Sequence, residues 1–406
     1  MSSLSRALRA LAGMPIDRDD QPTWPVPVDP TNPADRAVAA YGALRARFGI
    51  DRRPGLFRED ARRSGGSHAY LWPFSRGAAA TLDLVELGVV APDEADAVLG
   101  AGLACYLRPG VALPAYDSAV RPPLGPGGDR FYDDNAWIGL DLVRQHHITG
   151  ADDALVRARR VFDFLVGGWD GDPTSPRPGG VTWVESAGNT DRNTVSTAPA
   201  AQLGYLLCSV EHDLGVREWA DRMLGWVHTA MRDPADGLYW DHVDATGAVE
   251  RTKWSYNQGN VIAAELAHHR LEAAARGPSV ALGSGPLARA EAVATAALDR
   301  YDAEPAGWAA QGLPFNAVFV RALLDLARET AEWSLQLRCF DAVAHWADQA
   351  WVERAEPSGL ARPAPGERRV TLIDQAALVE AQAIAAMAAG RRPTAPAEPV
   401  EPTEPG

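Results

Sequence analysis

The sequence is poor in cysteine and methionine and has no obvious disulfide or metal framework. Its 406 residues include 3 Cys and 5 Met. Cys105, Cys208 and Cys339 lie far apart, and none belongs to a CxxC or another metal-ligand spacing. We therefore expect free thiols, with Cys208 buried in an apolar run, and we expect no metal and no cofactor.

Long apolar segments are also lacking. Arg6 and Arg9 interrupt the N-terminal apolar residues, so the apolar core of about 7–15 residues that a signal peptide needs is not formed. No stretch reaches the roughly 18 uncharged apolar residues that would span a bilayer. These features predict a soluble, cytoplasmic protein.

Basic residues are outnumbered, since 39 Lys and Arg face 53 Asp and Glu for a formal net charge of −14. Nucleic acids and anionic membranes select a basic face, so neither is an expected partner. What the chain does have is tryptophan, with 13 residues against 9 Tyr and 9 Phe. Such flat, amphipathic rings belong either in a core or under a sugar ring, and a neutral oligo- or polysaccharide suits the acidic charge.

Most of the chain repeats apolar residues at helical spacing, as Leu155, Ala158, Phe162 and Leu165 illustrate. There are twelve such patterns and no alternation of strands with helices, which predicts an all-α fold. Six helical hairpins closed in a ring, an (α/α)6 toroid, use all twelve. An open solenoid is the alternative, although no fixed-period repeat supports it. The predicted helices are Asp35–Phe48, Pro73–Leu87, Pro92–Leu107, Asn135–Ile148, Asp152–Val166, Thr194–Leu214, Val216–Arg232, Asn257–Ala275, Pro286–Tyr301, Asn316–Glu329, Trp333–Val352 and Thr371–Ala389.

The remaining segments divide the chain. Residues 1–31 read as an N-terminal arm, residues 32–390 as one domain, and residues 391–406 as a disordered Pro/Glu tail. Leu238–Val243 and Ala248–Tyr256 alternate around a turn and predict a β-hairpin between helices. In a toroid, such an insertion sits with the loops at one end of the ring, where function is expected.

The most informative residues are Asp133 and Asp134, which follow a Gly-rich loop at a predicted helix start. Two aspartates there are often only caps. Phe131, Tyr132 and Trp137 crowd this pair, however, and two carboxyls held close together cannot both ionise cheaply. One carboxyl then serves as an acid while the other stays anionic, as the hydrolysis of a glycoside requires.

Two further segments carry candidate substrate-binding residues. Trp183 and Asn193 follow a Gly-Gly turn, and Trp254, Tyr256, Asn257 and Gln258 leave the predicted hairpin for a helix. An aromatic plate beside amide groups suits a sugar and its hydroxyl groups. The alternatives are that Trp183 belongs to the core and that Asn193 and Asn257 only cap helices. The helix starts around Tyr70–Arg76 and Gly312–Asn316 are expected to be mainly structural.

Taken in order, these motifs resemble glycoside hydrolase family 76, which contains endo-α-1,6-mannanases and related fungal wall transglycosidases. The resemblance spans about Trp72–Ala389 and rests on the segments DDNAW, GGVTW, RNTVS, WSYNQG and FNAVFVR. It implies an (α/α)6 fold and a retaining mechanism, with Asp133 as nucleophile and Asp134 as acid/base. It also implies that five of the candidate binding residues lie around the substrate groove, namely Trp183, Asn193, Tyr256, Asn257 and Gln258. Arg192 stands where the family usually has Lys, and Asn316 where it tends to have Lys, so subsite preferences differ.

Two other functions fit the same fold. A sugar epimerase or isomerase would transfer protons through histidines, for which His146-His147 and His268-His269 are the available pairs. A non-catalytic glycan-binding protein would be expected to lack one carboxylate of the pair, whereas both are present.

Overall fold

The computed structural model describes residues 29–50, 53, 55–61, 67–276, 285–303 and 307–392. The predicted arm (1–31) and tail (391–406) fall almost entirely outside these residues. Within them, all three cysteines are free thiols, and Cys208 and Cys339 are buried.

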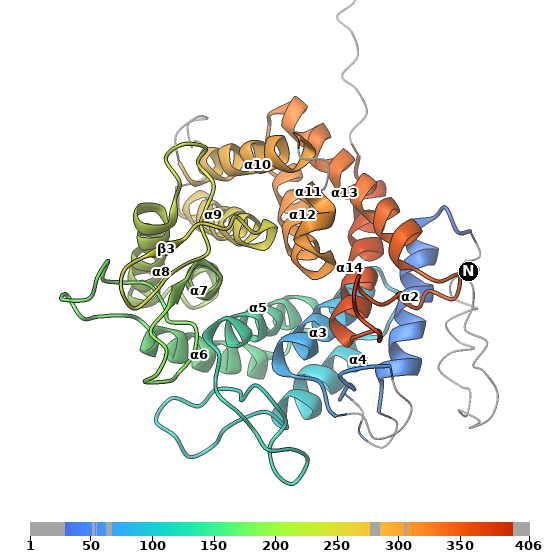
Figure 1. Cartoon of the computed structure of the whole chain (residues 1–406), viewed down its shortest axis with the longest axis horizontal. Coiled ribbons are helices and arrows are strands. Elements are labelled where there is room, and N and C mark those ends of the chain that lie inside the picture. Colours follow the sequence, from blue (N-terminus) through green and yellow to red (C-terminus); the bar gives the residue numbers. More distant parts are fainter. Residues whose placement is uncertain are drawn as a thin grey trace, which may run out of the picture.

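The described helices form two concentric rings, which confirms the (α/α)6 toroid (Figure 1). Each inner helix packs on its two inner neighbours and on an outer helix, and α2 closes the outer ring by packing on α14. A short helix, α11 (Gly307–Gln311), precedes α12. The inner helices are α3 (Leu71–Glu86), α5 (Tyr132–Thr149), α7 (Thr194–Glu211), α9 (Ser255–Arg276), α12 (Leu313–Ala327) and α14 (Leu372–Ala389). The outer ones are α2 (Pro33–Phe48), α4 (Pro92–Ala97), α6 (Asp152–Gly167), α8 (Leu214–Trp226), α10 (Pro286–Ala303) and α13 (Trp333–Arg354).

The apolar pattern of each helix matches its place in the ring. Outer helix α6 buries Ala154, Ala158, Phe162 and Leu165 and leaves its charged residues outside. Inner helix α14 is apolar on nearly all sides and is long and apolar enough to cross a membrane, but 78% of that stretch is buried within the fold. Its apolar character is therefore that of a core helix.

Two predicted helices end early in π-helical turns. The predicted Pro92–Leu107 helix is α4 followed by η1 (Val98–Gly102), and α8 likewise continues as η2 (Val227–Met231). At η1 the reason is close packing of two backbones, because a Cβ on Gly102 would lie 2.2 Å from the carbonyl oxygen of Gly55. Helical periodicity does not reveal such a contact.

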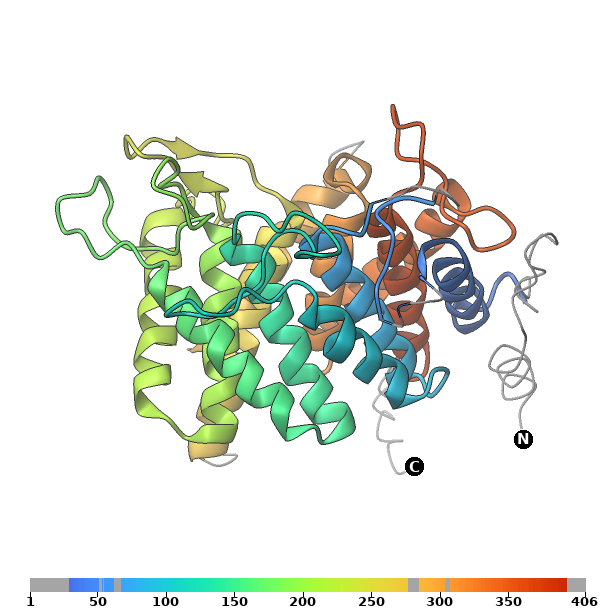
Figure 2. The same cartoon turned by 90° about the horizontal axis from the view of Figure 1, so that it is seen from below.

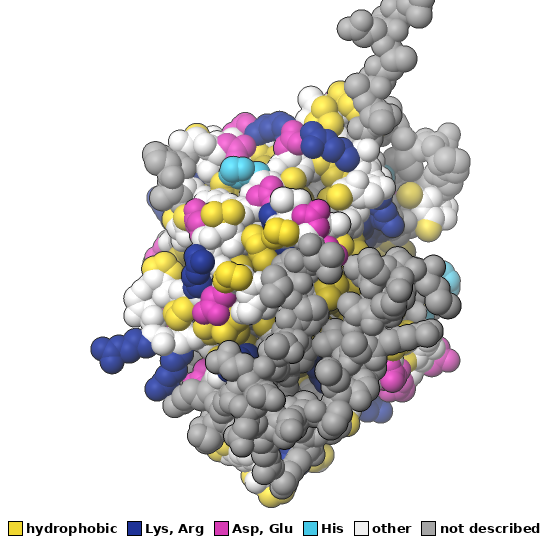
Figure 3. All heavy atoms as spheres, turned by 90° about the vertical axis from the view of Figure 1, so that its right-hand side faces the viewer, with side chains coloured by type: hydrophobic (Ala, Val, Ile, Leu, Met, Phe, Trp, Pro, Cys, Tyr) yellow, Lys and Arg dark blue, Asp and Glu magenta, His cyan; other side chains and the backbone are white. Residues whose placement is uncertain are grey.

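The predicted β-hairpin is present but shorter, with strands β2 (His242–Val243) and β3 (Val249–Glu250). A strand that was not predicted, β1 (Arg192–Asn193), pairs antiparallel with β2 and places Asn193 opposite His242. This small sheet lies among the loops at one end of the ring (Figure 2). The outer surface is mixed, with basic, acidic and apolar side chains interspersed on the face in Figure 3.

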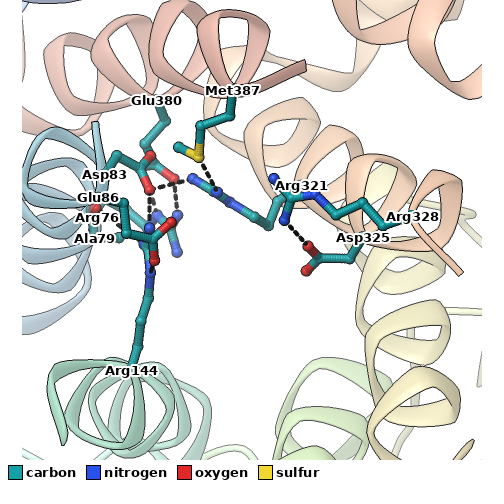
Figure 4. Close-up of polar contacts among 10 residues, drawn as sticks. All are labelled: Arg76, Ala79, Asp83, Glu86, Arg144, Arg321, Asp325, Arg328, Glu380 and Met387. Atoms are coloured by element: carbon teal, nitrogen blue, oxygen red, sulfur yellow. Dashed lines mark hydrogen bonds and ion pairs between the residues drawn. The ribbon is translucent and has the colours of Figure 1, made fainter. Parts of the chain in front are cut away.

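Below the loops, a buried ionic network joins four inner helices (Figure 4). Asp83 of α3 accepts hydrogen bonds from Arg144 of α5 and Arg321 of α12. Arg144 also donates to Glu86 at 2.7 Å. Arg76 of α3 pairs with Glu380 of α14. This ion pair thus links α3, the first inner helix of the ring, to α14, the last.

Asp141 of α5 is the surplus acid in this network. Arg76, Arg144 and Arg321 already balance Glu380, Asp83 and Glu86. The Asp141 carboxyl is buried and its Oδ2 has no partner among the described residues. Burial raises the pKa of Asp141 to about 7, although Arg76 and Arg144 oppose this.

We predict that D141N is more stable than the wild type above pH 7. Because the folded state binds this proton more tightly than the unfolded chain, its stabilisation is present below pH 3.8 and is lost as pH rises to about 7. The isosteric amide avoids that loss, which is worth about 1–3 kcal/mol at pH 8. Thermal unfolding at pH 5 and pH 8 measures it, with exposed Asp93→Asn as control. An equal Tm difference at both pH values would contradict the prediction.

Candidate active site

The two predicted catalytic residues occupy the first turn of inner helix α5. This helix starts at the end of the ring that carries the loops and the small sheet, which we call the mouth (Figure 2). Asp133 and Asp134 are both half-buried. Asp133 Oδ1 accepts a hydrogen bond from the Asp134 backbone N–H at 3.0 Å. Asp133 Oδ2 accepts one from the indole Nε1–H of Trp183 at 3.1 Å. Asp133 is thereby held in one orientation as a hydrogen-bonded anion.

Trp183, which was predicted to bind substrate, lies beside the pair. Its side chain is 39% exposed and packs edge-on against Phe131, with ring centroids 5.1 Å apart. Its carbonyl oxygen accepts from the Tyr132 backbone N–H, and its own N–H donates to the Asp191 carbonyl oxygen at 2.8 Å. The indole therefore has one polar edge on Asp133 and an exposed surface beside it, which is the arrangement of a sugar platform.

The Gly-Gly turn before Trp183 allows the loop to lie flat against a helix. Gly179 and Gly180 have φ values of 101° and 86°, which disfavour other residues. A Cβ on Gly180 would lie 2.6 Å from the ring of Trp226. Nearby, buried Arg192 donates to the Pro176 carbonyl oxygen at 2.8 Å and fastens the same loop. At the position where the family usually has Lys, this chain therefore has an arginine that holds the loop in place.

Asn135 holds the start of α5 in place, a role that the sequence analysis missed. Its Nδ2 donates to the carbonyl oxygens of Tyr116 and Phe131, and its Oδ1 accepts from the Tyr116 N–H at 2.9 Å. The side chain is fully buried and all of these bonds go to backbone, so it fixes the position of the helix start that carries Asp133 and Asp134. Its position directly after the two aspartates is the only sequence feature that marks it.

A third carboxylate, Asp241, faces the pair and was also missed. It precedes β2, and its Oδ1 accepts from Asn257 Nδ2 at 3.2 Å and from the Tyr256 hydroxyl at 3.5 Å. Its Oδ2 lies 3.0 Å from His242 Nδ1. A single Asp in a predicted strand carries no spacing that would identify it.

The proton affinities of the pair are both raised. Burial, aided by the charge of Asp241, raises the pKa of Asp133 to about 6, while the bonds from Asp134 N–H and Trp183 lower it. Burial and the neighbouring charge of Asp133 raise the pKa of Asp134 well above its usual range. Asp134 receives no such hydrogen bond from the described residues. It is therefore the more readily protonated of the two, and Asp133 is the more readily ionised.

Three of the other predicted binding residues surround Asp241. Burial and the carboxylates Asp241 and Asp133 raise the pKa of Tyr256, so its phenol stays a neutral donor. Asn257 is buried and donates a hydrogen bond to Asp241, and its Oδ1 has no partner among the described residues. Asn193, at the start of α7, does not cap that helix, and its Oδ1 is likewise unpartnered. Both amide oxygens are buried, so a ligand hydroxyl reaches them only if the surrounding side chains move.

Trp254 belongs to an aromatic cluster at the same end of the ring. Its ring centroid lies 5.4 Å from that of Phe315, which also contacts Tyr256 at 4.2 Å and Trp72 at 6.0 Å. All four side chains are half-buried. Trp72 and Phe315, from segments expected to be mainly structural, therefore extend the aromatic wall.

Gln258 is not placed to bind substrate, which corrects the prediction made for it. It is fully buried, its Oε1 accepts from the Tyr239 N–H, and its Nε2 donates to the carbonyl oxygens of Tyr239 and Trp254. Its amide is thus used to hold the hairpin against α9.

The histidine pairs considered for an isomerase lie away from this mouth. His146 and His147 are in the last turn of α5, at the end opposite to Asp133. His268 stacks on Tyr205 in the second half of α9, with centroids 4.5 Å apart. Among the described residues, no group of three or more His, Cys, Asp or Glu side chains is arranged to hold a metal ion.

Comparison with known proteins agrees with this geometry. The model of glycosyl hydrolase family 76 matches residues 122–269, which include the aspartate pair, Trp183 and Asp241. No curated protein matches the chain in sequence.

Solved structures of this family share the fold. A family 76 glycoside hydrolase from a bovine Bacteroides thetaiotaomicron strain aligns with a TM-score of 0.70 and 25% identity, over 88% of this chain and 78% of that one. An α-mannanase of Bacteroides thetaiotaomicron aligns with a TM-score of 0.70 and 17% identity, over 88% and 98% of the two chains. An α-1,6-mannanase of Salegentibacter sp. HEL1_6, solved with α-1,6-mannotriose as an inactive variant in which two consecutive Asp residues are Asn, aligns with a TM-score of 0.69 and 19% identity, over 88% and 100%.

Proposed function

This chain resembles glycosyl hydrolase family 76 in sequence over residues 122–269 and in fold over most of its length, and from that premise we propose that it is a retaining glycosidase that cleaves α-1,6-linked mannosides. The observation that carries the proposal is the pair Asp133–Asp134 at the start of α5: Asp133 accepts hydrogen bonds from the Asp134 N–H and the Trp183 indole, while burial and the charge of Asp133 raise the pKa of Asp134. The α-1,6-mannotriose bound by the Salegentibacter relative supports the substrate class.

In the first half of the proposed reaction, Asp133 attacks the anomeric carbon and forms a covalent glycosyl ester. The bond to the leaving oxygen breaks as Asp134 donates its proton to that oxygen. In the second half, Asp134, now a carboxylate, takes a proton from water, which attacks the same carbon and releases Asp133. The two displacements restore the starting anomer and both carboxyl groups.

The surrounding groups fit a neutral hexose. Trp183 presents an exposed indole beside the nucleophile, and the cluster of Trp254, Tyr256 and Phe315 provides a second aromatic wall. Asp241, which accepts from Asn257 and Tyr256, can also accept hydrogen bonds from sugar hydroxyls. Aromatic faces with a few convergent acceptors are typical of carbohydrate sites.

The test is to incubate the protein with α-1,6-mannotetraose and follow the first product by proton NMR. Retention predicts that the newly formed reducing end appears first as the α-anomer and only later equilibrates. The initial appearance of the β-anomer would contradict the double displacement. Tight binding of the oligosaccharide with no product after prolonged incubation would instead show a glycan-binding protein. The cytoplasmic location stays a prediction, which cell fractionation tests.

We predict that W183F lowers kcat/KM about tenfold and moves the acidic limb of its pH profile to higher pH. The Trp183 Nε1–H donates to Asp133 and lowers the pKa of that carboxyl, so its loss makes the nucleophile harder to ionise. Phenylalanine keeps an aromatic face for the sugar. An acidic limb that stays at its wild-type pH would show that the indole serves only as a platform.

A further inference from the structure

A buried cation lies under the catalytic pair. Asp134, Trp137 and Asp141 follow one another at spacings of three and four residues, so they share one face of α5. Trp137 is buried, and the guanidinium carbon of Arg76 lies 5.5 Å from the centroid of its ring. About one turn along α5 from the carboxyl pair, the indole of Trp137 therefore lies beside the guanidinium of Arg76.

Arg76 is held rigidly. Its Nε donates to Glu380 Oε1 at 3.1 Å, and its Nη2 donates to Glu380 Oε2, which makes the pair bidentate between α3 and α14 (Figure 4). Both side chains are almost completely buried. Buried ion pairs are often replaceable by apolar residues at no loss of stability. Its place below the active site therefore suggests a role beyond stability.

The charges around this guanidinium come from four inner helices. Glu380 faces it from α14, Asp83 from its own helix, Asp141 and Arg144 from α5, and Arg321 from α12. Above the indole, Asp133, Asp134 and Asp241 form the acidic site, with the Tyr256 phenol beside them. Arg76 and Glu380 balance each other, whereas the site above carries net negative charge, so removing either charge of the pair is expected to shift the titration of the carboxyls.

We propose that Arg76 is a positioning residue of the catalytic site: it holds Trp137 beneath Asp133 and Asp134 and, with Glu380, sets the pH range in which the pair works. The catalytic role of the pair rests on the proposed function. The arrangement of Arg76, Trp137 and the two carboxyls is independent of that proposed function.

Opposite shifts distinguish this role from a structural one. E380Q removes the charge that neutralises Arg76, so the exposed positive field favours ionised carboxyls. R76M leaves Glu380 as a buried anion and disfavours them. For unit charges about 10 Å apart at an effective dielectric constant of about 20, each change shifts the titration of the pair by about one pH unit. R76M/E380Q removes both charges and returns the titration close to that of the wild type.

The experiment has two independent measurements. The first is the pH profile of kcat/KM on an α-1,6-mannooligosaccharide, in which E380Q moves both limbs to lower pH and R76M moves both to higher pH. The second follows the carboxyl carbons in [13C]aspartate-labelled protein by NMR, and D133N and D134N are used to assign the two signals. The NMR titration needs no substrate, so it tests the positioning role even if mannoside hydrolysis fails.

The matched control is E265Q. Glu265 of α9 is also fully buried and forms a bidentate pair with Arg289 of α10, at 2.6 and 2.9 Å, but it lies between an inner and an outer helix. It is expected to lower Tm without moving the titration of Asp133 or Asp134. If R76M does not fold, E380Q and R76M/E380Q together supply the test, because E380Q shifts the titration and the double variant returns it close to that of the wild type. E380Q and R76M proteins that lower Tm while both carboxyls titrate as in the wild type would overturn the proposal.

Discussion

Replacing Asp133 with Asn or Ala is expected to abolish mannoside turnover, with a loss of about 10⁴-fold or more in kcat. The reason is that the glycosyl–enzyme bond in the proposed mechanism is made to this carboxylate. Its orientation is set by the Trp183 Nε1–H and the Asp134 N–H, which bond to different carboxylate oxygens. The single amide oxygen of D133N can accept only one of these bonds, but the side chain is half-buried and lies at a helix start. The fold is therefore expected to survive.

Initial rates on α-1,6-mannotetraose, together with thermal unfolding, check this prediction. The matched control is D129N, since Asp129 is an exposed carboxylate on the loop just before the pair. It is expected to leave kcat within about twofold of the wild-type value. A folded D133A variant with near wild-type activity would exclude Asp133 as the nucleophile.

Replacing Asp134 with Ala is expected to cause the second large loss, and one that depends on the leaving group. Asp134 is the better proton holder because burial and the charge of Asp133 raise its pKa. Without this proton a natural sugar alkoxide leaves poorly, and a loss of about 10²–10⁴-fold is expected. An activated aryl α-1,6-mannobioside needs no such proton, so its first displacement stays fast.

Azide separates the roles of the two aspartates. In D134A the covalent ester accumulates because no base activates water, and azide, which needs no base, is expected to restore turnover of the aryl mannobioside. The mannosyl azide from D134A should keep the α configuration, because two displacements occur. In D133A any azide product should be β, since azide then attacks directly. The reverse pattern of products would exchange the two assignments.

The helices and the position of the aspartate pair at a helix start were predictable because both are local. Helical periodicity depends on neighbours three and four residues apart, so outer helices such as α6 could be placed to within a few residues. Asp133 and Asp134 are adjacent in the chain, so no tertiary information was needed to bring them together. The predicted helices failed where packing intervenes, as at η1, where the backbone at Gly55 meets Gly102.

Asp241 and Asn135 could not be identified as members of the site because their roles depend on distant partners. The pairing of β1 with β2 brings Asp241 close to the pair, and the sequence of β1 shows no strand pattern. Gln258 was misjudged for the same reason, since its amide is used by the backbone of Tyr239. Side-chain chemistry alone does not distinguish an amide that binds a ligand from one that holds a loop.

By itself, then, the sequence determined an acidic, Trp-rich chain of helical hairpins with two adjacent carboxyls at a helix start. Those properties depend on composition and on residues close together in the chain. The tertiary structure decided which tryptophans face the pair, that a third carboxylate joins it, and that Arg76 and Glu380, 304 positions apart, meet beneath it. Closing the ring buries these charges side by side, and burial is what raises the pKa of both aspartates above the ordinary value.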